Sequence, residues 1–88
     1  MTEIVLDGWV LETMEGVHQR FAPLFPDYYG RNLDALFDCL TDYPGALTVR
    51  LRRREVLEDR LGRRGRALVR LLRRAAEENP RLTLVEED

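Results

Sequence analysis

The 88-residue sequence has one cysteine, one histidine, and neither serine nor lysine. A single cysteine cannot form an internal disulfide, so we expect a reducing compartment, with Cys39 as a small buried side chain. Because serine is absent and His18 is the one histidine, neither a serine–histidine triad nor a histidine metal site is expected. The sequence therefore predicts no cofactor.

Long apolar runs are missing as well. No run approaches the roughly 18 apolar residues that a membrane-spanning helix requires. The opening residues, MTEIVLDGW, contain no basic region, so we expect neither export nor membrane insertion, and a cytoplasmic location. The length suits a single domain over residues 1–88 and leaves no room for a second.

Charge is small in total but unevenly distributed. The net charge is −2, yet residues 1–49 carry eight acidic residues against two arginines, which gives −6. Residues 50–88 carry twelve arginines against eight acidic residues, which gives +4. We therefore expect the functional face in the first half of the chain and a basic partner for it.

Apolar periodicity and turn residues predict seven secondary-structure elements. Strands are expected at 3–6, 46–51 and 81–85, and helices at 14–22, 32–41, 52–61 and 65–78. Thr13 and Asn32 are expected as N-caps, Gly62 as the residue that ends the third helix, and residues 86–88 as an acidic tail. Helical connections between strands favour parallel pairing with right-handed crossovers. The sequence thus predicts an α/β fold, with a three-stranded parallel sheet packed with about four helices.

Residues 26–42, PDYYGRNLDALFDCLTD, join an aromatic turn to a short helix. Helical spacing puts the apolar residues on one side and a polar arc beside them: Leu33, Leu36, Phe37 and Leu40, then Asp34, Asp38 and Thr41. Two carboxylates four residues apart repel by roughly 0.2–0.5 kcal/mol in an isolated helix, so helix propensity alone does not favour them. Gly30, in the turn, is expected to adopt a positive φ.

The acidic arc has two interpretations. It can be the solvated face of an amphipathic helix, or a surface that binds a basic partner. Tyr28 and Tyr29 favour the second, because rigid aromatic residues beside charged ones are typical of interface hot spots. An anionic, convex patch suits a basic, concave partner, and the phosphate-binding active site of a ribonuclease is one.

Residues 28–41, YYGRNLDALFDCLT, resemble the signature of the barstar family of intracellular ribonuclease inhibitors, and the order of elements fits along nearly the whole chain. The resemblance implies a stoichiometric inhibitor, not an enzyme, in a 1:1 complex with a secreted or toxin-type ribonuclease. Asp38 would take the place of a substrate phosphate in the active site, with Asp34 as a second anionic contact. The neighbouring partner-binding residues that the resemblance implies are Tyr28, Tyr29, which supports the turn, Gly30, Asn32, Phe37 and Thr41.

Three positions depart from the family pattern. Phe37 stands where the archetype has tryptophan, so the apolar surface is kept and the indole N–H is lost. The segment after Thr41 is shorter, which leaves Tyr43 as the aromatic candidate there. Arg74, on the long helix, stands where the archetype has a glutamate contact. This charge reversal implies either a different partner enzyme or a binding surface centred on residues 28–41.

Other functional classes compete with inhibition. Asp34 and Asp38 could form an acid–base pair, but catalysis needs a concave site with carboxylates in different environments. The arginines of the second half could bind nucleic acid, yet no aromatic residue follows Tyr43, and seven acidic residues lie within 55–87. A solvated helical face laced with ion pairs is the favoured interpretation of those arginines. A further alternative is that the protein inhibits another enzyme or toxin with a basic site.

Overall fold

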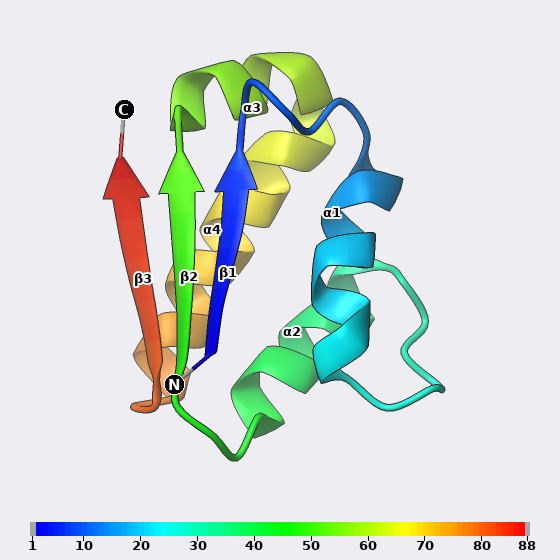
Figure 1. The fold of residues 1–88 in the computed structure, drawn as a ribbon, viewed down its shortest axis with the longest axis vertical. Coiled ribbons are helices and arrows are strands. Elements are labelled where there is room, and N and C mark those ends of the chain that lie inside the picture. Colours follow the sequence, from blue (N-terminus) through cyan, green and yellow to red (C-terminus); the bar gives the residue numbers. More distant parts are fainter. Residues whose placement is uncertain (1, 88) are drawn as a thin grey trace.

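A computed structural model describes residues 2–87, and these form three strands and four α-helices (Figure 1). In chain order the elements are β1 (Thr2–Asp7), α1 (Met14–Phe21), a 3₁₀ turn (Ala22–Leu24), α2 (Leu33–Asp42), β2 (Leu47–Arg52), α3 (Arg54–Leu61), α4 (Arg63–Glu78) and β3 (Leu82–Glu87). The predicted α/β fold is confirmed. Asp88, the last residue of the predicted acidic tail, lies outside the described residues, as does Met1.

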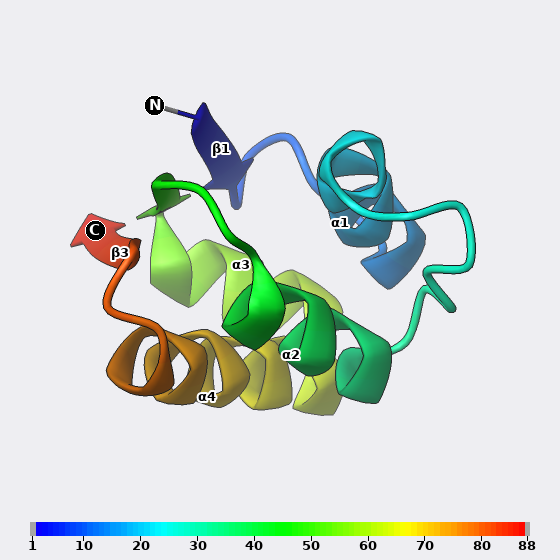
Figure 2. The same ribbon diagram turned by 90° about the horizontal axis from the view of Figure 1, so that it is seen from below.

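The sheet has the order β1-β2-β3, and both pairs of strands are parallel. The connection from β1 to β2 contains α1 and α2, and the connection from β2 to β3 contains α3 and α4. Seen along the strands, α2 and α4 lie on one side of the sheet, and α1 lies beside β1 (Figure 2). Within residues 2–87, one face of the sheet is therefore packed against helices, and the opposite face has no helix over it.

Strand alternation selects the residues that fill the core. Leu47, Val49 and Leu51 of β2 are almost fully buried, and α4 brings Leu68 and Leu72 against them in one apolar cluster. A buried leucine of this kind stabilises the fold by about 1.5–3 kcal/mol relative to an exposed one. The two buried leucines of α2, Leu36 and Leu40, belong to the same cluster. The helix that carries the acidic residues is thus fixed to the core by its opposite face.

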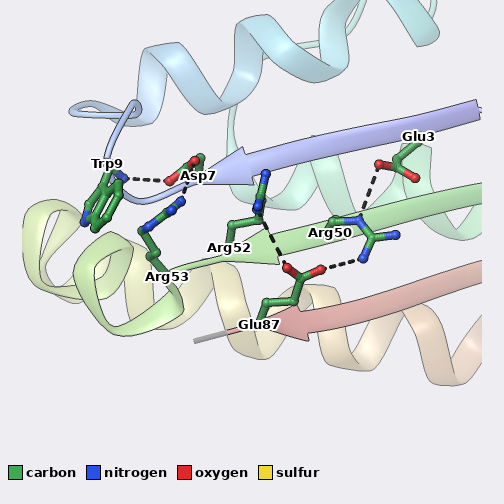
Figure 3. A network of polar contacts seen from close by, with 7 residues as sticks. All are labelled: Glu3, Asp7, Trp9, Arg50, Arg52, Arg53 and Glu87. Atoms are coloured by element: carbon green, nitrogen blue, oxygen red, sulfur yellow. Dashed lines mark hydrogen bonds and ion pairs between the residues drawn. The ribbon is translucent and has the colours of Figure 1, made fainter.

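The helix-free face of the sheet is covered by ion pairs (Figure 3). The guanidinium of Arg50, on the central strand, lies 3.4 Å from Glu3 of β1 and 2.5 Å from Glu87 of β3. Arg52 adds a contact of 3.7 Å to Glu87. Parallel sheets are usually covered on both faces, and each exposed ion pair contributes only about 0.2–1 kcal/mol. The pairs therefore let this face stay in water without adding much stability.

Most element boundaries differ from the prediction by one residue, and three differ by two: the end of β3, the start of α3 and the start of α4. β3 continues through Glu86 and Glu87, which were predicted as the start of a tail, because Glu87 pairs in register with Arg52. Arg52 belongs to β2 for the same reason, and α3 begins only after Arg53, which adopts a left-handed conformation with φ 53°. The long helix begins at Arg63, directly after Gly62. Gly62 has φ 66° and ends α3, as predicted.

Candidate protein-binding site

The aromatic turn before α2 sends its two tyrosines in different directions. Tyr28 is 85% exposed, whereas Tyr29 is 8% exposed and belongs to the core cluster. The Tyr29 ring packs edge-on against Phe25, with 5.1 Å between the ring centroids. Of the two, Tyr28 is available to a partner, and Tyr29 supports the turn from beneath.

A buried histidine holds Tyr29 in place. The Nδ1 atom of His18, on α1, is hydrogen-bonded to the hydroxyl of Tyr29, and His18 is 5% exposed. Burial lowers the pKa of His18, and the charge of Arg31 lowers it further. Burial also raises the pKa of Tyr29, to about 12. At neutral pH, both groups are therefore uncharged, and α1 is joined to the aromatic turn by a neutral pair.

The lowered pKa of His18 makes the fold sensitive to acid. As pH falls below 6.5, the unfolded chain binds a proton before the folded chain does, so stability present above that pH is lost. We expect the free energy of unfolding, measured by urea titration, to drop from pH 7.5 to 5.5. The drop should be smaller in His18→Gln, which cannot titrate. An equal drop in both proteins would contradict this role of His18.

The residue with a positive φ just before α2 is Arg31 and not Gly30. Gly30 was predicted to have a positive φ, but in the described residues the glycine with positive φ is Gly62, and Arg31 has φ 53°. A Cβ on Gly30 would lie 3.1 Å from the Nδ2 atom of Asn32, which is tighter than most contacts. Gly30 thus leaves room for the Asn32 side chain, and Arg31 carries the left-handed strain that the glycine was expected to absorb.

Asn32 is the N-cap of α2, as predicted. Its Oδ1 atom accepts a hydrogen bond of 2.8 Å from the backbone N–H of Ala35. Such a cap stabilises a helix by about 1 kcal/mol. Phe37 was predicted on the packing face, and its ring is only half-buried, at the edge of the core cluster. A partner can therefore reach Phe37 from the surface.

Three carboxylates form an exposed line along α2. Asp34, Asp38 and Asp42 are four residues apart, each is exposed, and none has an ion pair within residues 2–87. Asp34, in the first turn, is stabilised by the helix dipole, whereas Asp42, in the last, is opposed by it. Within the described residues, the free protein therefore carries this negative line without an ion pair. The spacing in the sequence could have identified Asp42, which lies one residue beyond the helix predicted at 32–41.

Asp38 lies on a ridge between two hollows. One, of about 490 Å³, lies between α2 and α4 and is lined by Asp34, Phe37, Asp38, Ala67, Arg70, Leu71 and Arg74. The other, of about 690 Å³, is lined by Asp38, Asp42, Cys39, Tyr28, Tyr43 and neighbouring residues. A ridge with a carboxylate at its crest has a shape that can enter a concave basic site.

Thr41 and Cys39 of α2 are less exposed than the three aspartates. The hydroxyl of Thr41 donates to the backbone carbonyls of Phe37 and Asp38, at 3.0 and 3.1 Å, so its donor is already used. Cys39 is half-buried, and burial raises the pKa of its thiol, as do the charges of Asp38 and Asp42. The thiol is thus neutral at physiological pH, and reactive-thiolate chemistry is disfavoured.

A residue near the last strand fixes the end of α2. Asn79, 4% exposed, donates from Nδ2 to the carbonyls of Leu40 (2.9 Å) and Tyr43 (3.2 Å), and its Oδ1 accepts from the backbone N–H of Arg81 (2.9 Å). These bonds satisfy carbonyls that a helix end leaves unpaired. The sequence showed Asn79 only as a helix-stopping residue before Pro80, and nothing local to it signals the contact with α2.

Comparison with known proteins identifies the family of the chain. A family model described as "Barstar (barnase inhibitor)" matches residues 1–86. The chain belongs to the barstar family. A relative named "Putative ribonuclease inhibitor YrdF", from Bacillus subtilis (strain 168), is 41% identical over 83 residues, which cover 89% of each chain.

Within residues 2–87 of this barstar-family chain, no group of three or more histidine, cysteine or acidic residues is placed to hold a metal ion. Nor does this part contain a helix long and apolar enough to cross a membrane.

Proposed function

We propose that the protein inhibits a ribonuclease by inserting the acidic ridge of α2 into the enzyme's basic active site, in a 1:1 complex. The observation that carries the proposal is Asp38, exposed, without an ion pair in the described residues, and raised between two hollows. A ribonuclease active site holds phosphates with cationic side chains. The carboxylate of Asp38 would replace one phosphate there, and that of Asp34 would contact the cations beside it.

The other predicted residues surround this pair. Tyr28 offers an exposed ring beside one hollow, and Phe37 offers a half-buried ring beside the other. Asn32 and Gly30 shape the turn at the start of α2, Tyr29 supports it from the core, and Thr41 lies half-exposed on the helix. The proposed surface is thus a charged centre with an aromatic rim, a composition that favours tight protein binding.

Electrostatics would also speed the encounter. The excess of acidic residues in the first half of the chain would attract a basic cleft, and such steering raises association rates in an ionic-strength-dependent way. Direct binding of RNA is disfavoured, because several arginines, Arg50, Arg52 and Arg53 among them, are already paired with carboxylates. On α4 such pairing is confirmed only for Arg73, within the described residues.

Inhibition of purified barnase, the enzyme in the family's description, tests the proposal. We expect the protein to slow RNA cleavage by barnase, to lose potency as RNA concentration rises, and to bind with a stoichiometry of one in calorimetry. Competition with RNA is expected because the ridge and the substrate would use the same cations. Binding that leaves cleavage unchanged, or inhibition that RNA does not relieve, would count against the proposed mode.

A further inference from the structure

The hollow between α2 and α4 has walls of opposite charge. The α2 wall carries Asp34 and Asp38, and the α4 wall carries Arg70 and Arg74. The remaining lining residues, Phe37, Ala67 and Leu71, are apolar. The hollow therefore offers a partner both an anionic and a cationic contact within about 490 Å³.

The two arginines of this hollow are not engaged elsewhere. Within residues 2–87, neither Arg70 nor Arg74 makes an ion pair, and both are exposed. Arg73, on the same helix, instead makes two hydrogen bonds, of 3.0 and 2.7 Å, to Glu86. Within the described residues, the fold thus pairs some of its arginines with carboxylates and leaves the charges of Arg70 and Arg74 available to a partner.

Arg74 is coupled to the proposed binding surface through Phe37. Its guanidinium carbon lies 5.1 Å from the centroid of the Phe37 ring, a cation–π contact. A partner that covers Phe37 would therefore also remove water from Arg74. A cation that loses its water without gaining an anion opposes binding, and a cation of the partner at the same place would repel it.

We infer that the cognate ribonuclease carries an acidic side chain at the rim of its active site, positioned to enter this hollow and pair with Arg74 and Arg70. The inference rests on the proposed function and adds a specificity determinant to it. The cations of the active site would bind Asp34 and Asp38, and the carboxylate at the rim would bind the α4 wall. An enzyme with a uniformly basic rim would be bound more weakly, so the inhibitor would favour ribonucleases whose rim carries a matching acid.

Charge-reversal cycles between this protein and barnase test the inference. Each lysine and arginine around the barnase active site is changed singly to glutamate, and Kd is measured for the wild-type protein, Arg74→Glu, Arg70→Glu and Arg66→Glu. Arg66 is the matched control: it is exposed, lies one turn before Arg70 on α4, and does not line the hollow. Each of the three arginine-to-glutamate variants changes the net charge of the inhibitor by the same amount.

We expect at least one rim reversal to tighten binding of the wild-type protein about tenfold and to weaken binding of Arg74→Glu relative to unmodified barnase. The Kd of Arg70→Glu should respond to each rim reversal as that of Arg74→Glu does. The Kd of Arg66→Glu should respond as that of the wild-type protein does. If every rim reversal affects the Arg74→Glu, Arg66→Glu and wild-type proteins alike while binding still requires Asp38, the inference is overturned and the proposed function stands. If no form of barnase binds the wild-type protein, both fail.

Discussion

Replacing Asp38 with alanine is expected to weaken binding to the target ribonuclease by about 2–5 kcal/mol, a range typical of buried charged pairs, complexes of this family among them. The loss is large because the cations of the active site would stay buried without their partner. Titration calorimetry with barnase measures the change in Kd.

The free protein should tolerate the same substitution. Removing Asp38 relieves repulsion with Asp34 and Asp42, worth roughly 0.2–0.5 kcal/mol per pair, so the free energy of unfolding should stay constant or rise slightly. Asp59→Ala is the matched control, because Asp59 is an exposed aspartate on α3 that lines neither hollow beside Asp38. An unchanged Kd for Asp38→Ala, or an equal loss for Asp59→Ala, would remove Asp38 from the interface.

Replacing Asn79 with alanine is expected to lower the free energy of unfolding by about 2–4 kcal/mol. The variant loses both donors to the carbonyls of Leu40 and Tyr43, and the acceptor for Arg81. The carbonyl of Leu40 then keeps only the longer hydrogen bond of 3.4 Å from the backbone N–H of Tyr43, and this weakened pairing in the core is the costly part of the change. Urea denaturation measures the effect.

A neighbouring substitution separates this role from a general effect on the end of α4. Glu78→Ala changes an exposed residue without a hydrogen bond to α2, so stability should change by less than about 0.5 kcal/mol. Equal stability of Asn79→Ala and the wild-type protein would mean that Asn79 does not hold α2.

Local signals were enough to predict the topology and the start of α2. The β-branched strands, the Asn32 cap and the apolar spacing of α2 depend on neighbours in the sequence, and the structure agrees with each. The position of the positive φ was predicted wrongly at Gly30. Glycine preference is only statistical: at Gly30 the lack of a Cβ leaves room for the Asn32 side chain, and the positive φ falls on Arg31 instead.

Features that depend on two distant elements could not be predicted. The contact of Arg74 with Phe37 requires the packing of α4 on α2, and the clamp of Asn79 joins residues 39 positions apart. The extension of β3 over Glu86 and Glu87 depends on register with β2, since acidic residues in isolation are typical of a tail. Charge and spacing thus located the acidic ridge, while its surroundings follow from tertiary packing.

The Asn79 clamp, its hydrogen bonds to the carbonyls of Leu40 and Tyr43, also joins parts of the chain that are synthesised at different times. Leu40 is made 39 residues before Asn79, so at 5–20 residues per second the end of α2 lacks its clamp for roughly 2–8 seconds. A helix of 10 residues is marginal in water without tertiary contacts. The acidic ridge is therefore synthesised early and becomes ordered late. A nascent chain that stops before Asn79 would carry every acidic contact residue and still lack an ordered surface to present.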